Sequence, residues 1–142
     1  MPDVPSLSLG TGLVTPLDLT AAFSVFPNGG LAVQPRGIIG VVDADGTAVL
    51  QNAARSERVI SPQTAFQMVS MLGDVIDRGT GSAARTLGVR FAVGGKTGTT
   101  NEFKDAWFVG FSSAVVAGVW VGFDQPKPIG REAYGEIGRA HV

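Results

Sequence analysis

The sequence predicts an α+β fold in which an antiparallel sheet carries packed helices. In the first half of the chain, two segments repeat apolar residues at helical spacing, and each begins with a capping residue followed by proline. In the second half, three strand-like segments follow one another with short connections, which suits antiparallel pairing. With 142 residues, 44% of them hydrophobic and 16% charged, the chain is expected to form a domain with a core.

The first half predicts a helix followed by a hairpin. The helix begins at Thr15-Pro16, with threonine as the cap, and stops at Asn28-Gly29-Gly30. Its apolar residues recur at helical spacing: Leu17, Leu19, Ala22, Phe23 and Phe26. The hairpin is predicted because the segment Arg36–Val42, which alternates weakly, is followed by the turn Asp43–Gly46 and by a returning segment, Thr47–Leu50.

A second helix is predicted to begin at Ser61-Pro62 and to end in the flexible turn Asp77–Gly81. One apolar face extends over about four turns, and it consists of Ala65, Phe66, Val69, Leu72, Val75 and Ile76. Met68 and Met71 lie on the same helix and are expected to fill gaps in the core. Arg85 and Arg90, further along the chain, are expected to be solvated.

Three strands are predicted in the second half of the chain: Phe91–Thr99, Asp105–Ser112 and Val115–Phe123. The longest apolar run, Ala114–Phe123, is shorter than the roughly 18 residues of a transmembrane helix. Its valine, tryptophan and phenylalanine residues favour a buried strand instead. Trp107 and Trp120 both fall in strand patterns, so we expect them in the core and not as ligand stackers.

The composition excludes several classes of function. The net charge is −1, which gives no long-range attraction to nucleic acid or to an anionic membrane surface. Because the chain has no cysteine, disulfides, thiolate catalysis and cysteine-based zinc sites are excluded. No metal and no cofactor is predicted.

The segment Lys96-Thr97-Gly98-Thr99 is the candidate functional motif, and two other interpretations compete for it. A phosphate-binding loop requires glycine five residues before Gly95, where this chain has Arg90, and it must continue into a helix, whereas a strand is predicted here. The other alternative is a glycine-rich edge strand with an exposed lysine.

The context of the motif favours a carboxylate-binding site over both alternatives. Thr97 and Thr99 share one face of a strand because side chains alternate, and Lys96 stands beside them. Gly94-Gly95 is expected to let another backbone or a ligand approach closely. Asp105 is expected to cap the turn that follows the motif.

Lys-Thr-Gly is also the third motif of serine β-lactamases and penicillin-binding proteins. Over residues 5 to about 135 the chain resembles the class A penicillin-binding proteins, the bifunctional peptidoglycan synthases. The resembling segments are Pro5–Gly10, Val14–Leu19, Phe26–Gly30, Arg78–Arg85, Gly95–Asn101, Asp105–Phe111 and Ala117–Asp124. The resemblance implies the fold of the serine β-lactamases and DD-transpeptidases. It also implies a serine-type D-Ala-D-Ala transpeptidase that crosslinks stem peptides and is acylated by β-lactams.

The resemblance also assigns roles to the motif. Lys96 supplies positive charge near the substrate carboxylate and assists proton transfer, and the hydroxyls of Thr97 and Thr99 bind that carboxylate. The main-chain N–H of Thr99 is one of two oxyanion donors, each typically worth roughly 3–4 kcal/mol. Gly98 leaves room for the acyl chain along the strand. The catalytic residues are therefore expected to be Lys96 and Thr99, and the substrate-binding residues Lys96, Thr97, Gly98 and Thr99.

Two motifs of the family have no match in this chain. No serine is followed by lysine three residues later, and none by asparagine two residues later. Residues 1–135 are therefore expected to be the C-terminal part of a transpeptidase domain, with the nucleophile encoded upstream. The parent protein is expected to carry a glycosyltransferase domain and an N-terminal anchor that holds it on the extracytoplasmic face of the bacterial membrane. The incomplete sheet is expected to be poorly stable by itself.

Residues 136–142 depart from the family's pattern and are expected to be a non-native tail. One reverse translation of them contains the start of a common sequencing-library adapter. An alternative for the whole chain is a penicillin-sensing or non-catalytic transpeptidase-like binding module. The context Asp105–Gly110 disfavours that alternative.

Overall fold

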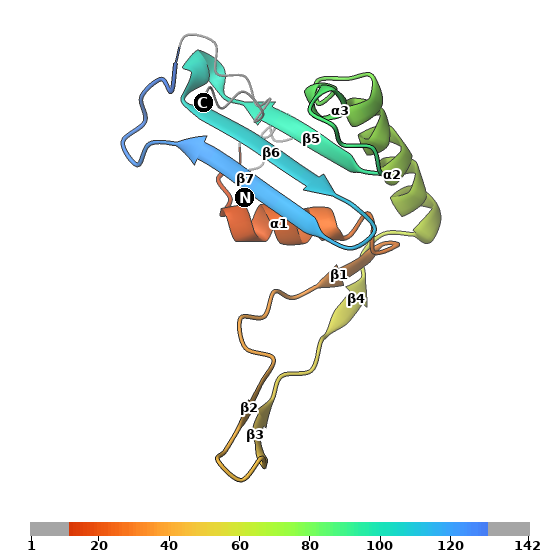
Figure 1. Cartoon of the computed structure of the whole chain (residues 1–142), viewed down its shortest axis with the longest axis vertical. Helices are drawn as coiled ribbons and strands as arrows, with labels where there is room; N and C mark the ends of the chain where they lie inside the picture. Colours follow the sequence, from red (N-terminus) through yellow and green to blue (C-terminus); the bar gives the residue numbers. More distant parts are fainter. Residues whose placement is uncertain (1–11, 131–142) are drawn as a thin grey trace.

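The computed structural model describes residues 12–130 and has an α+β architecture. A three-stranded antiparallel sheet carries helix α1 against β6 and β7, while helix α2 lies along β5 (Figure 1). A hairpin arm, residues 34–55, projects away from this body (Figure 1). The predicted boundary at residue 135 and the predicted tail lie outside the described residues.

The sheet consists of β5 (Gly94–Thr99), β6 (Asp105–Phe111) and β7 (Val116–Gly122) in the order β5-β6-β7. All three predicted strands are present and pair as expected. The first, however, begins at Gly94, so the prediction that Phe91–Val93 belongs to it is wrong. Gly94 already pairs with Phe111, the last residue of β6. The chain then turns back into β7, and no residue of β6 remains to pair with the preceding segment.

Helix α1 (Pro16–Ser24) starts as predicted, since the Thr15 hydroxyl accepts a hydrogen bond from the Asp18 N–H at 3.1 Å. It ends earlier than the apolar pattern suggested. Gly29 and Gly30 have φ of 63° and 92°, and the Gly30 N–H donates to the Val25 carbonyl at 2.8 Å. These glycines lie in the turns that follow the helix and direct the chain toward Leu31, because they adopt positive φ without steric cost.

Helix α2 (Pro62–Asp77) matches its predicted start, with the Ser61 hydroxyl accepting from the Thr64 N–H at 3.0 Å. Only a narrow stripe of its predicted apolar face is buried, namely Ala65, Leu72 and Ile76. Phe66 is 74% exposed and Met71 55% exposed, so their assignment to the core is wrong. The helix packs mainly on strand β5, and side chains that point away from this contact, such as Phe66, remain in solvent.

The hairpin arm contains β2 (Gly40–Val42) and β3 (Ala48–Gln51), which pair antiparallel as predicted. The sequence did not indicate the short pair at its base, β1 (Leu31–Val33) with β4 (Ser56–Arg58). Two further short elements were also missed, helix α3 (Ala83–Thr86) and a 3-10 helix, Asn101–Phe103.

Strand β7 is not the buried strand that its apolar sequence predicted. Val119, Trp120 and Val121 are 42%, 37% and 39% exposed. Helix α1 covers one face of this strand, at Gly118, where an added Cβ would collide with the Thr20 hydroxyl. Val119 and Val121 lie on the other face. Among residues 12–130, no helix has the length and apolarity needed to cross a membrane.

Candidate functional site at the edge of the sheet

Lys96, Thr97, Gly98 and Thr99 form most of β5, which lies at the edge of the three-stranded sheet. The Thr100 N–H donates to the Asp105 carbonyl at 3.1 Å, and hydrogen-bonded pairs alternate along an antiparallel ladder. By this alternation Gly98 and Lys96 bond toward β6. The main-chain groups of Thr97 and Thr99 are therefore directed toward the outer edge of the sheet. An edge strand of this kind can be extended by a peptide in the manner of an added strand.

The motif uses both faces of the sheet. Opposed residues in a ladder share a face, so Lys96 lies on the face of Val109 and Gly118, toward α1. Thr97 and Thr99 lie on the opposite face. The exposed Lys96 side chain nevertheless returns to the outer edge, where its ammonium donates to the Thr97 carbonyl oxygen. The lysine charge and the two threonines thus meet at the edge itself.

Thr97 has a partner that the sequence did not single out. Its hydroxyl lies 2.8 Å from the hydroxyl of Thr80, a residue in the turn after α2. That turn had been predicted only as a flexible helix end. The signal that could have found it was the pair of glycines around Thr80, together with the resemblance of Arg78–Arg85 to the family.

Asp105 caps the turn after the motif, as expected. It binds Thr100 in two ways, since the Thr100 hydroxyl donates to its carboxylate at 3.2 Å and accepts from its N–H at 2.8 Å. The other carboxylate oxygen accepts from the Trp120 indole N–H at 2.9 Å. Trp120 in turn packs against Trp107, with ring centroids 6.3 Å apart. The two tryptophans therefore pack on each other on one face of the sheet, from neighbouring strands, although Trp120 remains partly exposed.

The double glycine before the motif allows close approach, as predicted, and the groups that approach come from β6. A Cβ added to Gly94 would lie 2.5 Å from the Phe111 ring, and one added to Gly95 would lie 2.8 Å from the Phe108 ring. Phe111 and Phe108 occupy opposite faces of β6. The two glycines thus admit aromatic rings on both faces. Gly95 also admits the backbone of β6, since its added Cβ would lie 2.9 Å from the Val109 carbonyl oxygen, so the predicted close approach of another backbone is present there.

Arg85 is not solvated, contrary to the prediction. Its guanidinium forms hydrogen bonds to the Asp77 carboxylate at 2.8 and 2.6 Å. It also donates to the carbonyls of Val89 and Phe91 at 3.0 and 2.8 Å. Its side chain is 28% exposed. Arg85 therefore ties the end of α2 to the segment that enters β5, whereas Arg90 is exposed as expected.

The turn between β5 and β6 carries the one resolved pKa shift in the described part of the chain. Lys104 lies 2.6 Å from Glu102 and lowers the pKa of this carboxyl by hydrogen bonding and by charge attraction. Glu102 and Phe103 both have positive φ, 64° and 54°, which is uncommon for residues other than glycine. The left-handed turn brings the chain from Thr100 directly into Asp105.

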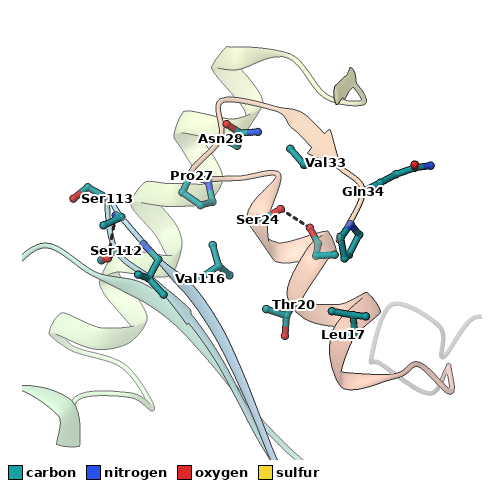
Figure 2. Close-up of a pocket in the computed structure, with 14 residues that line it drawn as sticks. Leu17, Thr20, Ser24, Pro27, Asn28, Val33, Gln34, Ser112, Ser113 and Val116 are labelled. Carbon is teal, nitrogen blue, oxygen red and sulfur yellow. Dashed lines mark hydrogen bonds between the residues drawn. The ribbon is translucent and has the colours of Figure 1, made fainter. Parts of the chain in front are cut away.

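Two cavities open near the other end of the sheet, and neither is lined by Lys96–Thr99. One, of about 480 Å³, lies between α1 and the turn that joins β6 to β7 (Figure 2). The second, of about 730 Å³, lies between α2 and the start of β5. The described residues hold no cluster of three or more side chains suited to a metal ion. The candidate site is thus an edge of the sheet and lies apart from both cavities.

Comparisons with known proteins identify related sequences and folds. The model of the penicillin-binding protein transpeptidase domain matches residues 4–140. Penicillin-binding protein 1A of Neisseria gonorrhoeae is 44% identical over 140 residues, which cover 95% of this chain and 17% of that protein. The protein of the same name from Pseudomonas aeruginosa is 38% identical over 180 residues, covering 92% of this chain and 22% of its own length.

Solved structures show the same relationship. The crystal structure of penicillin-binding protein 1A from Haemophilus influenzae superimposes with a TM-score of 0.83 at 28% identity, covering 92% of this chain and 25% of that one. Penicillin-binding protein 3 from Mycobacterium tuberculosis gives a TM-score of 0.70 at 31% identity, covering 82% and 31%.

The chain belongs to the penicillin-binding protein transpeptidase family, and it is homologous to the transpeptidase part of the class A member penicillin-binding protein 1A. It spans about a fifth of the length of these curated relatives. The α+β fold class predicted from the sequence, with its antiparallel sheet, is confirmed.

Proposed function

We propose that this chain supplies the carboxylate-binding and oxyanion-binding wall of a serine-type D-Ala-D-Ala transpeptidase. One observation carries the proposal: the Lys96 ammonium, the Thr97 hydroxyl and the outward-facing main chain of Thr97 and Thr99 meet at the open edge of β5. A stem peptide ends in a carboxylate and has an extended backbone. Both features match an edge strand that presents a cation and hydroxyl groups.

Each residue of the motif then has a distinct task. Lys96 attracts the substrate carboxylate and assists proton transfer. The hydroxyls of Thr97 and Thr99 donate hydrogen bonds to the substrate carboxylate. The Thr99 N–H binds the oxyanion that forms on the carbonyl under attack. A Cβ added to Gly98 would lie 3.3 Å from the Trp107 Cβ. Without a side chain at this position, the acyl chain can lie close along the strand.

The covalent chemistry requires a serine that this chain does not place in a family motif. In the proposed reaction the serine oxygen bonds to the carbonyl carbon of the penultimate D-alanine. The peptide bond to the last D-alanine breaks, and that residue leaves as the free amino acid with the serine proton. An amine from a second stem peptide then attacks the ester carbonyl, which forms the crosslink and restores the serine hydroxyl. A β-lactam is attacked in the same way, but its acyl-enzyme persists.

We further propose that the parent protein acts on the extracytoplasmic face of the bacterial membrane, held there by an N-terminal anchor. A glycosyltransferase domain is expected in the same polypeptide. These proposals rest on the class A homology. Sequencing the gene upstream of residue 1 tests them, and an upstream region without a membrane-spanning segment or without a glycosyltransferase domain would contradict them.

Labelling with a fluorescent penicillin tests the reaction. The complete gene product is expected to be acylated, whereas residues 1–142 alone are not. Lys96→Ala in the complete protein is expected to slow acylation by at least about tenfold, since a charged hydrogen bond is worth about 1.5–3 kcal/mol. Lys127→Ala, which removes another exposed lysine, is the matched control and leaves the rate unchanged.

Three results would contradict parts of the proposal. Labelling of the 142-residue chain would show that the nucleophile lies within it. A complete protein that takes up no penicillin would refute the transpeptidase assignment. Acylation without any crosslinking of stem peptides would favour the sensing module instead.

A further inference from the structure

We propose that Thr80 is a positioning residue, which sets the direction of the Thr97 hydroxyl so that it donates to the substrate carboxylate. The inference rests on the proposed function of the β5 edge. It adds a residue from a different part of the chain, the turn that follows α2, and it assigns that turn a function in the recognition of anionic substrates.

The contact between the two residues is direct. The hydroxyl oxygens of Thr80 and Thr97 are 2.8 Å apart, although the residues are 17 positions apart in the sequence. Thr97 is half-buried and Thr80 is exposed at the same edge. An exposed threonine at the end of a helix does not need such a partner. Their contact therefore places a second hydroxyl next to the one that is proposed to bind substrate.

The turn around Thr80 is closely packed on the helix. The N–H groups of Gly79 and Gly81 both donate to the Val75 carbonyl, at 3.1 and 2.9 Å. A Cβ on Gly79 would lie 2.8 Å from the Val75 Cα, and one on Gly81 would lie 2.7 Å from the Ile76 Cδ1. The contact at Gly79 is with backbone and excludes a side chain there, whereas a side chain at Gly81 would require the buried Ile76 to shift. The turn is thereby fastened to α2.

Helix α2 is in turn fixed against the sheet. Ile76 is 1% exposed, and α2 packs along β5. The distance between Thr80 and Thr97 is consequently set by buried packing and not by a mobile loop. The separation of the two hydroxyls depends on the same contacts that hold the helix on the strand.

The chemistry of the three groups determines the direction of the hydrogen bonds. Each hydroxyl has one proton to donate, whereas a carboxylate can only accept. When a carboxylate occupies the edge, the Thr97 proton points to it. The Thr97 oxygen then accepts the proton of Thr80. A chain from Thr80 through Thr97 to the carboxylate results, and each bond in such a chain polarises the next.

This chain makes a selective prediction. Without the Thr80 hydroxyl, the Thr97 proton is free to rotate away from the substrate. The acylation rate constant is therefore expected to fall more for substrates that carry a carboxylate than for substrates that lack one. The complete protein is tested with benzylpenicillin and with its methyl ester, and the ratio of the two second-order acylation rate constants is measured. Wild type is expected to favour the acid.

Thr80→Val removes the hydroxyl while keeping the shape, and it is expected to lower the acid-to-ester ratio by about three- to tenfold, the effect of one hydrogen bond. Thr80→Ser keeps the hydroxyl and retains the ratio within about twofold. Thr86→Val, at another exposed threonine nearby, leaves it unchanged. Thr97→Val lowers the ratio at least as far as Thr80→Val, and the double variant lowers it no further, because the two hydroxyls act as one chain.

Two outcomes would overturn the inference while the proposed function stands. One is an unchanged ratio in Thr80→Val. The other is an equal slowing of acid and ester, which would mark Thr80 as merely structural. If Thr80→Val lowers the melting temperature, the acid-to-ester ratio is measured in Thr80→Ala instead, and the same decrease is expected. A wild-type protein that reacts with neither compound, or with both equally, would instead refute the carboxylate site itself.

Discussion

The β5-β6-β7 sheet and the hairpin arm (residues 34–55) are both antiparallel, but they are stabilised in different ways. In the sheet, Ala106, Val109 and Phe111 of the central strand are buried, and rings from β6 lie over glycines of β5. In the arm, every residue except the half-buried Arg36 is exposed. The arm is held by its backbone ladder, by the Asp43 turn and by polar contacts at its base.

This difference explains where the candidate site lies. A carboxylate-binding edge needs atoms held in place before the substrate arrives, because ordering them during binding costs affinity. The edge of β5 has packed neighbours on its inner side and α2 along its length. The arm has no such support from the described residues. We therefore expect substitutions in the sheet to change stability and penicillin acylation. Equivalent substitutions in the arm are expected to affect only the arm.

The largest expected difference involves glycine. Gly95→Ala places a methyl group 2.8 Å from the Phe108 ring and 2.9 Å from the Val109 carbonyl, so it is expected to destabilise the fold by about 1–3 kcal/mol. Gly37→Ala in the arm meets no atom within 4 Å and is expected to change stability by less than about 0.5 kcal/mol. Calorimetry of the complete protein measures the stability change of both variants. The unfolding transition of the transpeptidase domain is recognised as the one that benzylpenicillin shifts. Equal effects would show that the close packing of β5 is not what holds the sheet.

A second comparison uses two aspartates that cap turns. Asp105→Ala removes the acceptor of the Thr100 hydroxyl and of the Trp120 indole, with an expected cost of about 1–2 kcal/mol and slower penicillin acylation. Asp43→Ala removes the acceptor of two backbone N–H groups, those of Asp45 and Thr47, at the arm tip. It is expected to increase hydrogen exchange there and to leave acylation unchanged. Slower acylation in Asp43→Ala would link the arm to the site and contradict the distinction.

Two arginines that bind backbone carbonyls give a smaller effect. Arg85→Ala loses the Asp77 pair and the bonds to Val89 and Phe91, and we expect it to cost about 1 kcal/mol, because the group is only partly shielded from solvent. Arg36→Ala in the arm loses one bond, to the Asn52 carbonyl, and is expected to cost about half as much or less. Thermal melting separates them. A larger effect at Arg36 would reverse the order of the two regions.

The smallest effect concerns pH at the turn after the motif. Lys104 lowers the pKa of Glu102 in the folded protein, so the pair adds stability at pH values above the carboxyl's unfolded pKa. That contribution is lost as the pH falls through the lowered, folded-state pKa. The Glu102 side chain is 70% exposed, and the change in stability is expected to be slight. An NMR titration should find the Glu102 midpoint below its ordinary value, and Lys104→Met should restore it.

The sequence predicted the strands and helices that begin with clear local signals. Thr15-Pro16 and Ser61-Pro62 mark both long helices, because side-chain caps and proline act within one turn. Three errors have a common cause. Phe66, Met71 and Val119 were assigned to the core from their apolar character, yet burial depends on which other element covers a face. Local sequence does not contain that information.

The residues of the candidate site likewise fall into those that the sequence identified and those that only the structure identified. The motif could be found because Lys96, Thr97 and Thr99 are contiguous and their spacing fixes their faces on a strand. Thr80 and Arg85 could not be assigned, since each acts on residues from another element. The sequence indicated that Gly94-Gly95 allows a close approach, but it could not show that the approaching rings and backbone belong to β6.

By itself, the sequence determined the family, the α+β class, the caps of the two long helices and the identity of the edge motif. These depend on residues close together in the chain. Only the tertiary structure decided that Lys96 reaches the outer edge from the opposite face, that Thr80 meets Thr97, and that α2 holds both in place. Such contacts depend on how a helix docks on a strand. The docking is set by packing between distant segments, here Ile76 and the glycine turn against β5.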